Sequence, residues 1–240
     1  MMRALCKTGA MASCINKKVL PMKPQFPHTQ PFDELPSTIP LYVHENALLP
    51  GGQLPLEIAD ERELKLFFHA LRSGQTIGII QPQENAKQYL YPVGCAGRIR
   101  QYRERKDGRI NVMLTGVCRF RIAEDLSADY DFAMIRADWR GFEVDYVTPQ
   151  VDAEASRVFM ANLQAYFQSQ KMQADWETLN KAHIEEVINN LILVINFSIA
   201  EKQQLLEAGT VEDRMHLFNQ MLLEKTTPVW RSGTQSEVLN

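Results

Sequence analysis

The sequence predicts an α+β fold in which a mixed β-barrel module is followed by a C-terminal helical bundle. The first observation is a period of two in the apolar residues before residue 148, which is typical of strands with one buried face. The second is a change to helical spacing after Thr148-Pro149. The third is the composition, because 45% hydrophobic and 23% charged residues are ordinary for a globular domain.

The two ends of the chain are predicted to lie outside the folded part. Residues 1–32 carry five basic and no acidic residues, with four prolines near their end, so a disordered basic extension is expected. Such a leader also resembles a mitochondrial targeting segment, and translation from Met11 or Met22 in place of Met1 is an open alternative. Residues 226–240 are expected to form a polar tail.

Residues 33–147 are expected to form a β-rich subdomain. Its predicted elements are strands at 37–43 and 53–58, a helix from Asp60 to Gly74, a short strand at 76–82, a long hairpin around Lys106-Asp107-Gly108 and a last strand at 130–140. The helix is predicted from apolar residues at helical spacing, between an aspartate that can cap it and a glycine that can end it. An Asp-Gly turn between two alternating runs is a strong hairpin signal.

The second strand of the hairpin raises the question of what its arginines do. From Asp107 to Ile122 the apolar residues fall mostly on even positions, whereas Arg119 and Arg121 have the opposite parity. Gly116 interrupts the run, which predicts either two collinear strands or one strand bent at the glycine. The arginines are therefore expected on a solvated face, and contact with an anion or an acidic peptide is the second interpretation.

Residues 148–225 are expected to form a helical subdomain. Four helices are predicted, at 151–170, 175–197, 198–209 and 210–224. The second contains the longest apolar run of the chain, Val187–Ile199, whose 13 residues include three asparagines. Because about 20 apolar residues are needed to cross a bilayer, this run predicts a buried helix.

The four cysteines favour a reducing, cytoplasmic setting. They form no CxxC pair and no Cys/His spacing suited to zinc, so neither a disulfide framework nor a metal site is expected. Cys95 and Cys118 both fall in predicted strands, where buried thiols are the simplest interpretation. Whether these two cysteines pair or react stays open at this point.

Motifs for catalysis are missing from the sequence. It has no GxxxxGK[ST] phosphate loop, no GxSxG elbow and no HExxH helix, and His183-Ile184-Glu185 has no PCxxC segment that would complete a zinc site. His69 is expected to be a half-buried helix residue, and the acids Asp60, Glu61 and Glu63 are explained by the preference of helix N-termini for negative charge. Neither enzymatic activity nor a cofactor is predicted.

Several segments resemble the N-terminal substrate-recognition domain of Lon proteases, in its stand-alone bacterial form. They are IPLYV, ALLPGGQLPLEI, TIGIIQP and the hairpin pair VGCAGRI and TGVCRFRI, and the resemblance runs from about Leu35 to Phe197 and beyond. It implies a PUA-like β-barrel, similar to that of pseudouridine synthases and archaeosine transglycosylases, followed by helices. The ATPase and Ser-Lys protease modules of a full Lon protease have no room in the remaining chain.

One segment departs from the pattern of that family. Where the family usually has an Ile-Phe-Glu-Pro-Arg-Tyr type segment after the second strand, residues 58–63 read IADERE. The change keeps the isoleucine, an acid and Arg62. The loss of the aromatic pair removes apolar surface from the junction between the loop and the helix.

The resemblance implies a non-catalytic module for polypeptide recognition. The candidate contact residues are an apolar loop with leucines that belong to no regular face, and two hairpin arginines: Leu48, Leu49, Pro50, Gly51, Gly52, Arg119 and Arg121. The expected ligands are unfolded or apolar polypeptide segments, which the module would pass to a protease or chaperone in trans. No contact with a membrane is expected. The alternative for the leucines is that they fold back into the core.

Two other functions stay open from the sequence. The 98–121 hairpin carries eight basic and two acidic residues, so RNA binding by a PUA-like module is the alternative function. Against it, the arginines are not interleaved with aromatic residues that stack on bases. The long apolar helix can also dock on a partner protein, although core packing explains it without a partner.

Overall fold

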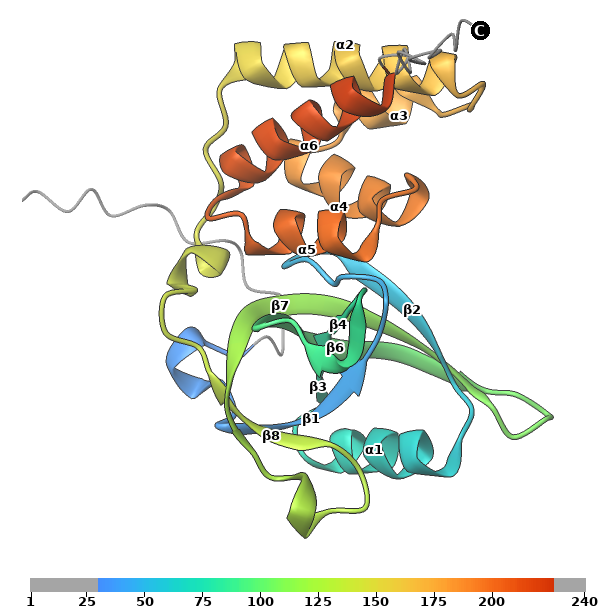
Figure 1. Cartoon of the computed structure of the whole chain (residues 1–240), viewed down its shortest axis with the longest axis vertical. Coiled ribbons are helices and arrows are strands. Elements are labelled where there is room, and N and C mark those ends of the chain that lie inside the picture. The colour runs from blue at the N-terminus through green and yellow to red at the C-terminus, as the bar shows by residue number, and fades with distance from the viewer. Residues whose placement is uncertain (1–29, 227–240) are drawn as a thin grey trace, which may run out of the picture.

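The structure of the chain, a computed structural model, consists of a β-rich part and a helical part that pack against each other (Figure 1). It describes residues 30–226, except for the side chains of 86–88. The predicted basic extension and polar tail therefore lie almost wholly outside the described residues. In Figure 1 the helical part lies above the strands, and the first helix lies at the opposite end of the β-rich part.

The elements follow the predicted order, strands first and helices last, so the α+β prediction is confirmed. The strands are β1 (Thr38–Val43), β2 (Gln53–Ile58), β3 (Thr76–Ile80), β4 (Pro82–Gln83), β5 (Ala86–Leu90), β6 (Val93–Glu104), β7 (Ile110–Asp125) and β8 (Met134–Asp138). The helices are α1 (Glu61–Arg72), α2 (Ala153–Ser169), α3 (Trp176–Lys181), α4 (Ile184–Val194), α5 (Ile199–Glu207) and α6 (Val211–Thr226). Short 3-10 turns are η1 (Phe32–Glu34), η2 (Ser127–Asp129) and η3 (Glu143–Tyr146).

The main strands pair in a closed ring. The order is β7-β6-β3-β1-β8, and β8 pairs again with β7. One edge of β7 pairs with β6, while β2 and β8 share its other edge. β1 and β3 are parallel, and the other pairings of the ring are antiparallel. A small barrel requires such a ring of paired strands. That the ring is a PUA-like barrel stays a prediction.

β7 is one continuous strand with an extra residue, so of the two alternatives at the glycine the bent strand is the one observed. Ala96 pairs with Cys118 and Gly97 pairs with Gly116, which leaves Val117 as a bulge. A bulge bends a strand and re-aims the side chains that follow it. Arg119, two residues after the bulge, meets the helical part rather than water.

The helix expected over 175–197 is wrong in extent, because this segment forms two helices. α3 ends at Lys181 and α4 begins at Ile184, and between them Ala182 and His183 have extended backbones with ψ of 152° and 143°. Two glutamates in the first turn of α4 are typical of a new helix start. Most of the apolar stretch of the predicted helix belongs to α4, whereas the buried Ile195 and Phe197 follow its last residue.

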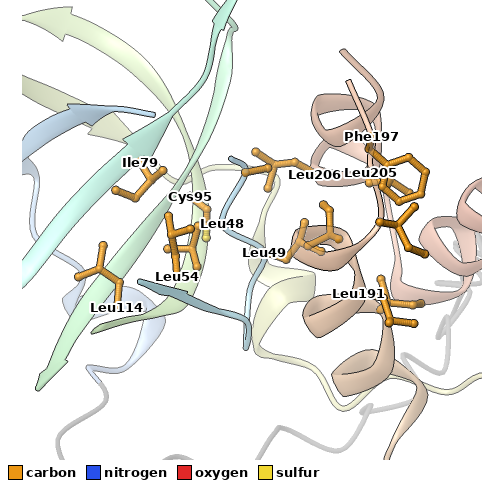
Figure 2. Packing of buried hydrophobic residues seen from close by; sticks show 14 of the residues in the cluster. Leu48, Leu49, Leu54, Ile79, Cys95, Leu114, Leu191, Phe197, Leu205 and Leu206 are labelled. Carbon is orange, nitrogen blue, oxygen red and sulfur yellow. The ribbon is translucent and has the colours of Figure 1, made fainter. Parts of the chain in front are cut away.

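One hydrophobic core runs through both parts of the molecule. It contains residues of β2, β3, β6, β7 and α1 together with residues of α2, α4, α5 and α6. Figure 2 shows its middle, where the loop between β1 and β2 lies between the strands and the helices. A smaller cluster around Phe120 draws residues from all five strands of the ring and fills its interior.

Candidate functional site

The loop that was predicted to contact substrates lies inside the protein. Leu48 and Leu49 are each 1% exposed, Pro50 and Gly52 are buried, and Gly51 is exposed. In Figure 2 Leu49 lies towards the helices and Leu48 towards the strands. The expectation that the leucines expose an apolar surface is therefore wrong, and the alternative, in which they fold back into the core, is observed.

Two glycines of the sheet leave room for this loop. A Cβ atom on Gly116 would lie 2.0 Å from the Leu49 carbonyl oxygen, and one on Gly97 would lie 2.7 Å from Leu48 Cδ2. Backbone hydrogen bonds also run in both directions between Gly116 and the two glycines of the loop. The apolar loop is therefore a plug between the β-rich and helical parts.

Arg119, another predicted contact residue, is buried at the same junction. It is 2% exposed, its Nη2 atom lies 2.8 Å from Asp145 Oδ1, and its backbone N–H and Nε also donate to the Asp145 carboxylate. Its guanidinium donates to the carbonyl oxygens of Leu206, Ala208 and Gly209 at 3.2, 2.6 and 3.1 Å. These carbonyls lie in the last turn of α5 and just after it, where intrahelical partners run out. The predicted solvated face is therefore wrong for Arg119.

Arg121 lies on the surface, as expected for a solvated strand face. Its guanidinium carbon lies 4.6 Å from the ring centroid of Phe142, and its Nη1 atom donates to the carbonyl oxygen of Arg140 at 3.4 Å. Further along the hairpin, Arg105 and Arg109 both bind one glutamate of β2, at 2.7 and 2.6 Å. Part of the positive charge of the hairpin is therefore compensated within the protein.

An open cleft lies beside α1. Figure 1 shows α1 at the end of the β-rich part that is remote from the helical part. The cleft consists of two adjoining hollows of 370 and 600 Å³, which share Tyr130, Asp131 and Phe132. Its walls are the end of β1, one side of α1 and the chain at 127–133. Volumes of roughly 300–1,000 Å³ are typical of ligand pockets. We call this feature the α1 cleft.

The α1 cleft exists because β8 leaves β1 early. β1 pairs with β8 through its first three residues only, and the last contact is from Leu41 N–H to the Ala133 carbonyl oxygen at 2.8 Å. The chain before β8 turns back to the end of β7, where Leu126 N–H donates to the Met134 carbonyl oxygen. The strand expected over 130–140 is therefore too long, since β8 begins at Met134 and the residues before it line the cleft.

Aromatic rings form one wall of the α1 cleft. The ring centroid of His69 lies 5.8 Å from that of Tyr130 and 5.1 Å from that of Phe132, and the two aromatic residues lie 5.5 Å apart. Tyr130 is 41% exposed, so ring surface faces the solvent. Burial, followed by the charge of Arg72, lowers the pKa of His69, which leaves this ring neutral near pH 7. The expectation of a half-buried helix histidine is confirmed.

Charged residues form the other wall. Asp60 caps α1 by accepting a hydrogen bond from Glu63 N–H at 2.8 Å, and Glu63 accepts one from the Tyr42 hydroxyl at 2.8 Å. Burial, together with the Glu63 carboxylate, raises the pKa of the Tyr42 phenol, which therefore stays a donor. Lys65 reaches Asp131 across the cleft at 3.2 Å. The junction without the aromatic pair is thus polar, and the aromatic surface comes from other segments.

The remaining chemistry-bearing groups point to no second site. Within residues 30–226, no group of three His, Cys, Asp or Glu side chains is placed to hold a metal ion, and no helix has the length and apolar character to cross a membrane. Cys95 and Cys118 are buried free thiols. Burial raises the pKa of both thiols, so they stay protonated and poorly reactive.

The α1 cleft was missed from the sequence for a physical reason. The alternation of Tyr130 to Arg140 predicts a strand, and a strand places these aromatic residues in a sheet rather than in a cleft wall. The available signal was the cluster of turn-forming residues at 127–131, where Ser127 accepts the backbone N–H of Met134. Such a cluster favours a late start for β8.

Comparison with known sequences gives one consistent result. The family model of the ATP-dependent protease La (LON) substrate-binding domain matches residues 38–224. The Lon protease of Flavobacterium johnsoniae is 26% identical over 221 residues, which are 86% of this chain and 26% of that protein. The Lon protease of Anaeromyxobacter dehalogenans is 23% identical over 203 residues, which are 80% of this chain and 24% of that protein. The chain spans about a quarter of the length of these relatives.

Solved structures with a similar fold belong to the same group. The crystal structure of a Lon N-terminal domain protein from Xanthomonas campestris has a TM-score of 0.57 and 19% identity, over 78% of this chain and 97% of that chain. The N-terminal domain of a Mycobacterium avium complex Lon protease has a TM-score of 0.57 and 18% identity, over 80% of this chain and 99% of that chain. At these identities the likeness concerns the fold, and it agrees with the α+β prediction.

Proposed function

Because this chain belongs to the ATP-dependent protease La (LON) substrate-binding domain family, we propose that it is a non-catalytic module that recognises polypeptide segments. The family match covers a substrate-binding domain, and neither an ATPase nor a protease domain is found with it. The observation that carries the proposal is the α1 cleft, because it offers apolar ring surface to the solvent.

The two walls of the α1 cleft suit an extended polypeptide of loose sequence. Apolar side chains of such a segment can pack on Tyr130 and Phe132, which form a preassembled aromatic surface. The polar wall contains Asp60 and Arg62, which can contact backbone and charged side chains. Both hollows are open, so the chain on either side of a bound segment can leave the cleft.

We also propose that the module passes its bound segment to a protease or chaperone in trans. This adaptor role is supported by the family match, because residues 38–224 match a substrate-binding domain, and such a domain can hold a segment that another protein then degrades or refolds. The test adds the purified chain to a full-length Lon protease that degrades a fluorescent unfolded protein. Faster degradation supports the adaptor role, whereas unchanged or slower degradation contradicts it.

RNA binding by the 98–121 hairpin has less support. Arg119 forms a buried ion pair, and Arg105 and Arg109 bind a glutamate of the neighbouring strand, so these three arginines already have partners within the protein. Phe120 is fully buried, so it offers no ring to a base. Arg98 and Arg103 are used to test this alternative, because both are hairpin arginines of β6.

The proposal is tested with reduced and carboxymethylated lactalbumin, a permanently unfolded protein, in fluorescence anisotropy titrations. Replacing Tyr130 and Phe132 by serine is expected to weaken binding by at least about tenfold, because aromatic anchors dominate such contacts. The matched control is Tyr89→Ser, which removes a 60% exposed ring outside the cleft and should leave the affinity unchanged.

The same titrations distinguish the alternatives. Equal affinity of the double variant and the native chain would contradict a role for the α1 cleft. A parallel titration uses oligouridine RNA at low and at high salt, with the variant Arg98→Glu/Arg103→Glu. Salt-sensitive RNA binding that this variant abolishes, without binding of the unfolded protein, would favour the nucleic-acid function.

A further inference from the structure

We propose that a polypeptide segment binds the α1 cleft by adding a strand to the open edge of β1. The inference rests on the proposed function, because it names the way in which the same site holds its ligand. It concerns the backbone of Val43, whereas the proposed function depends on the aromatic wall. The two can therefore fail separately.

The hydrogen-bond pattern shows which way the backbone of Val43 points. Leu41 N–H donates to the Ala133 carbonyl oxygen on the β8 side, and His44 N–H donates to the Ile80 carbonyl oxygen on the β3 side. Residues two apart in a strand direct their N–H and C=O groups to the same side. Val43 therefore directs both of its backbone groups to the side of Ala133, away from β3.

That side of β1 is open at Val43. The register of β1 with β8 stops at Pro40, and no other strand among residues 30–226 pairs there. The 370 Å³ hollow is lined by Leu41, Tyr42 and Val43 in succession. Successive side chains of a strand point to opposite faces, so a hollow that meets all three lies along the edge. Val43 is 46% exposed, in agreement with an uncovered edge.

The end of the sheet at β2 is protected, in contrast to this edge. Gly52 accepts a hydrogen bond from β7, so alternate residues from Gly52 face β7 and Pro55 faces outwards. Proline has no N–H to donate, and Glu57 on the same side is held by two arginines. Proline and charged residues are the usual means of blocking strand addition. The edge of β1 at Val43 has neither.

An extended polypeptide is the ligand that this edge selects. A strand edge presents an N–H and a C=O group at the spacing of another backbone, which is the basis of recognition by strand addition. The lining of the hollow has three acids, Asp60, Glu63 and Asp131, against Arg62 as its one base. Together with the aromatic wall, this charge favours segments that combine apolar and basic residues over acidic ones.

The test uses two labelled peptides of alternating sequence, valine with lysine and valine with glutamate, in anisotropy titrations of the whole chain. The critical variant is Val43→Pro, which removes the edge N–H but no hydrogen bond to β3, because this N–H points away from β3. Proline is tolerated at such a position, and β1 already contains Pro40. The matched control, Val43→Thr, keeps the N–H and the shape of the side chain.

The valine–lysine peptide is expected to bind more tightly than the valine–glutamate peptide. Val43→Pro is expected to weaken its binding by roughly five- to tenfold, since one hydrogen bond is lost, and Val43→Thr should stay within about twofold of the native chain. In NMR hydrogen exchange, saturating valine–lysine peptide should slow exchange of the Val43 amide in the native chain. This second measurement does not depend on the folding of any variant.

Strand addition is overturned if the proline and threonine variants bind the peptide equally well, or if the Val43 amide exchanges at the same rate with and without peptide. It is also overturned if neither peptide binds while the unfolded protein does. In each of these cases the function proposed above stands, provided that the variant lacking Tyr130 and Phe132 loses binding of the unfolded protein. Equal affinity of that variant would instead contradict the proposed site.

Discussion

The junction between the two parts and the α1 cleft use similar side chains in opposite ways. At the junction, which comprises the loop 48–52, Arg119 and the facing ends of α4 and α5, leucines are fully buried and a charged pair is hydrogen-bonded throughout. At the α1 cleft, aromatic rings stay partly exposed and the ion pair of Lys65 lies at the surface. The junction thus stabilises the fold, while the cleft keeps contact surface for a ligand.

The physical reason for the difference is what covers each region. The helical part covers the junction, so the donors of Arg119 must find acceptors inside the protein. Buried amides add to this connection, because Asn189 and Gln203 donate to the carbonyl oxygens of Pro50 and Val93 across the two parts. No described element covers the α1 cleft, since β8 departs from β1 there.

The largest effect is expected from Arg119→Met. This change leaves Asp145 buried without its partner and three carbonyl oxygens without a donor, so we expect a loss of about 3–5 kcal/mol in the free energy of unfolding. Urea denaturation followed by circular dichroism measures it. The control is Arg121→Met, two residues along the same strand, for which a change within about 0.5 kcal/mol is expected because Arg121 is exposed. Equal effects of the two variants would contradict the contrast between regions.

The second effect in size is expected from Leu49→Ala. Truncating a leucine that is 1% exposed removes apolar contacts and leaves a cavity between the sheet and the helices, which costs about 2–5 kcal/mol. Thermal and urea unfolding of this variant are compared with those of Val194→Ala, whose side chain is 56% exposed and should matter little. A loss below about 1 kcal/mol for Leu49→Ala would mean that the loop does not plug the junction.

The pH dependence compares one tyrosine from each region. Burial raises the pKa of Tyr146 near the junction and of Tyr42 at the α1 cleft, where Glu63 also contributes. Folding favours the neutral phenol. The contribution of each phenol to the free energy of unfolding is therefore fully present below about pH 10, the pKa of a free phenol, and is lost as the pH rises above it. At about pH 11, Tyr146→Phe should reduce this loss by up to about 1 kcal/mol, and Tyr42→Phe by less because water screens a half-exposed group.

Unfolding titrations below and above pH 10, which is about the pKa of a free phenol, measure this effect for the native chain and both phenylalanine variants. The absorbance of tyrosinate in the folded protein provides an independent check. If both phenols have the pKa of free tyrosine in the folded chain, the linkage between their burial and stability is refuted.

The smallest effect is expected from Lys65→Met. Lys65 pairs with Glu61 one turn earlier in α1 and with Asp131 across the α1 cleft, but both ion pairs are exposed to solvent and screened by salt. We expect no measurable change in the midpoint of urea unfolding at physiological salt. A clear loss of stability would show that the wall of the cleft is held as tightly as the junction.

Local patterns predicted most of the strands and helices correctly. The Asp-Gly turn and the alternation around it are observed as the hairpin of β6 and β7, and Asp60 caps α1 with the expected geometry. These features are caused by residues that are close together in the sequence, so they can be predicted from the sequence alone. There are two errors of extent. At 175–197, the extended backbones of Ala182 and His183 divide the predicted helix. At 130–140, the first residues contact His69 of α1 instead of extending β8.

The predicted contact residues show what local patterns do not contain. The alternation in β7 correctly places Arg119 on the opposite face from the apolar residues at even positions. Alternation assigns residues to the two faces of a strand, but it does not tell whether either face is exposed to water. The end of α5, whose hydrogen-bonded residue Ala208 lies 89 residues later in the chain, covers the face of Arg119. Arg121, beyond that cover, stays exposed.

By itself, the sequence determined the α+β class, the hairpin, the order of the elements and the burial of the two strand cysteines. The tertiary structure alone decided that Leu48 and Leu49 are a plug, that Arg119 is an internal ion-pair partner, and that Tyr130 and Phe132 line a cleft beside α1. The reason is that periodicity follows from each residue's own neighbours, whereas burial and exposure follow from which distant segment packs on each face.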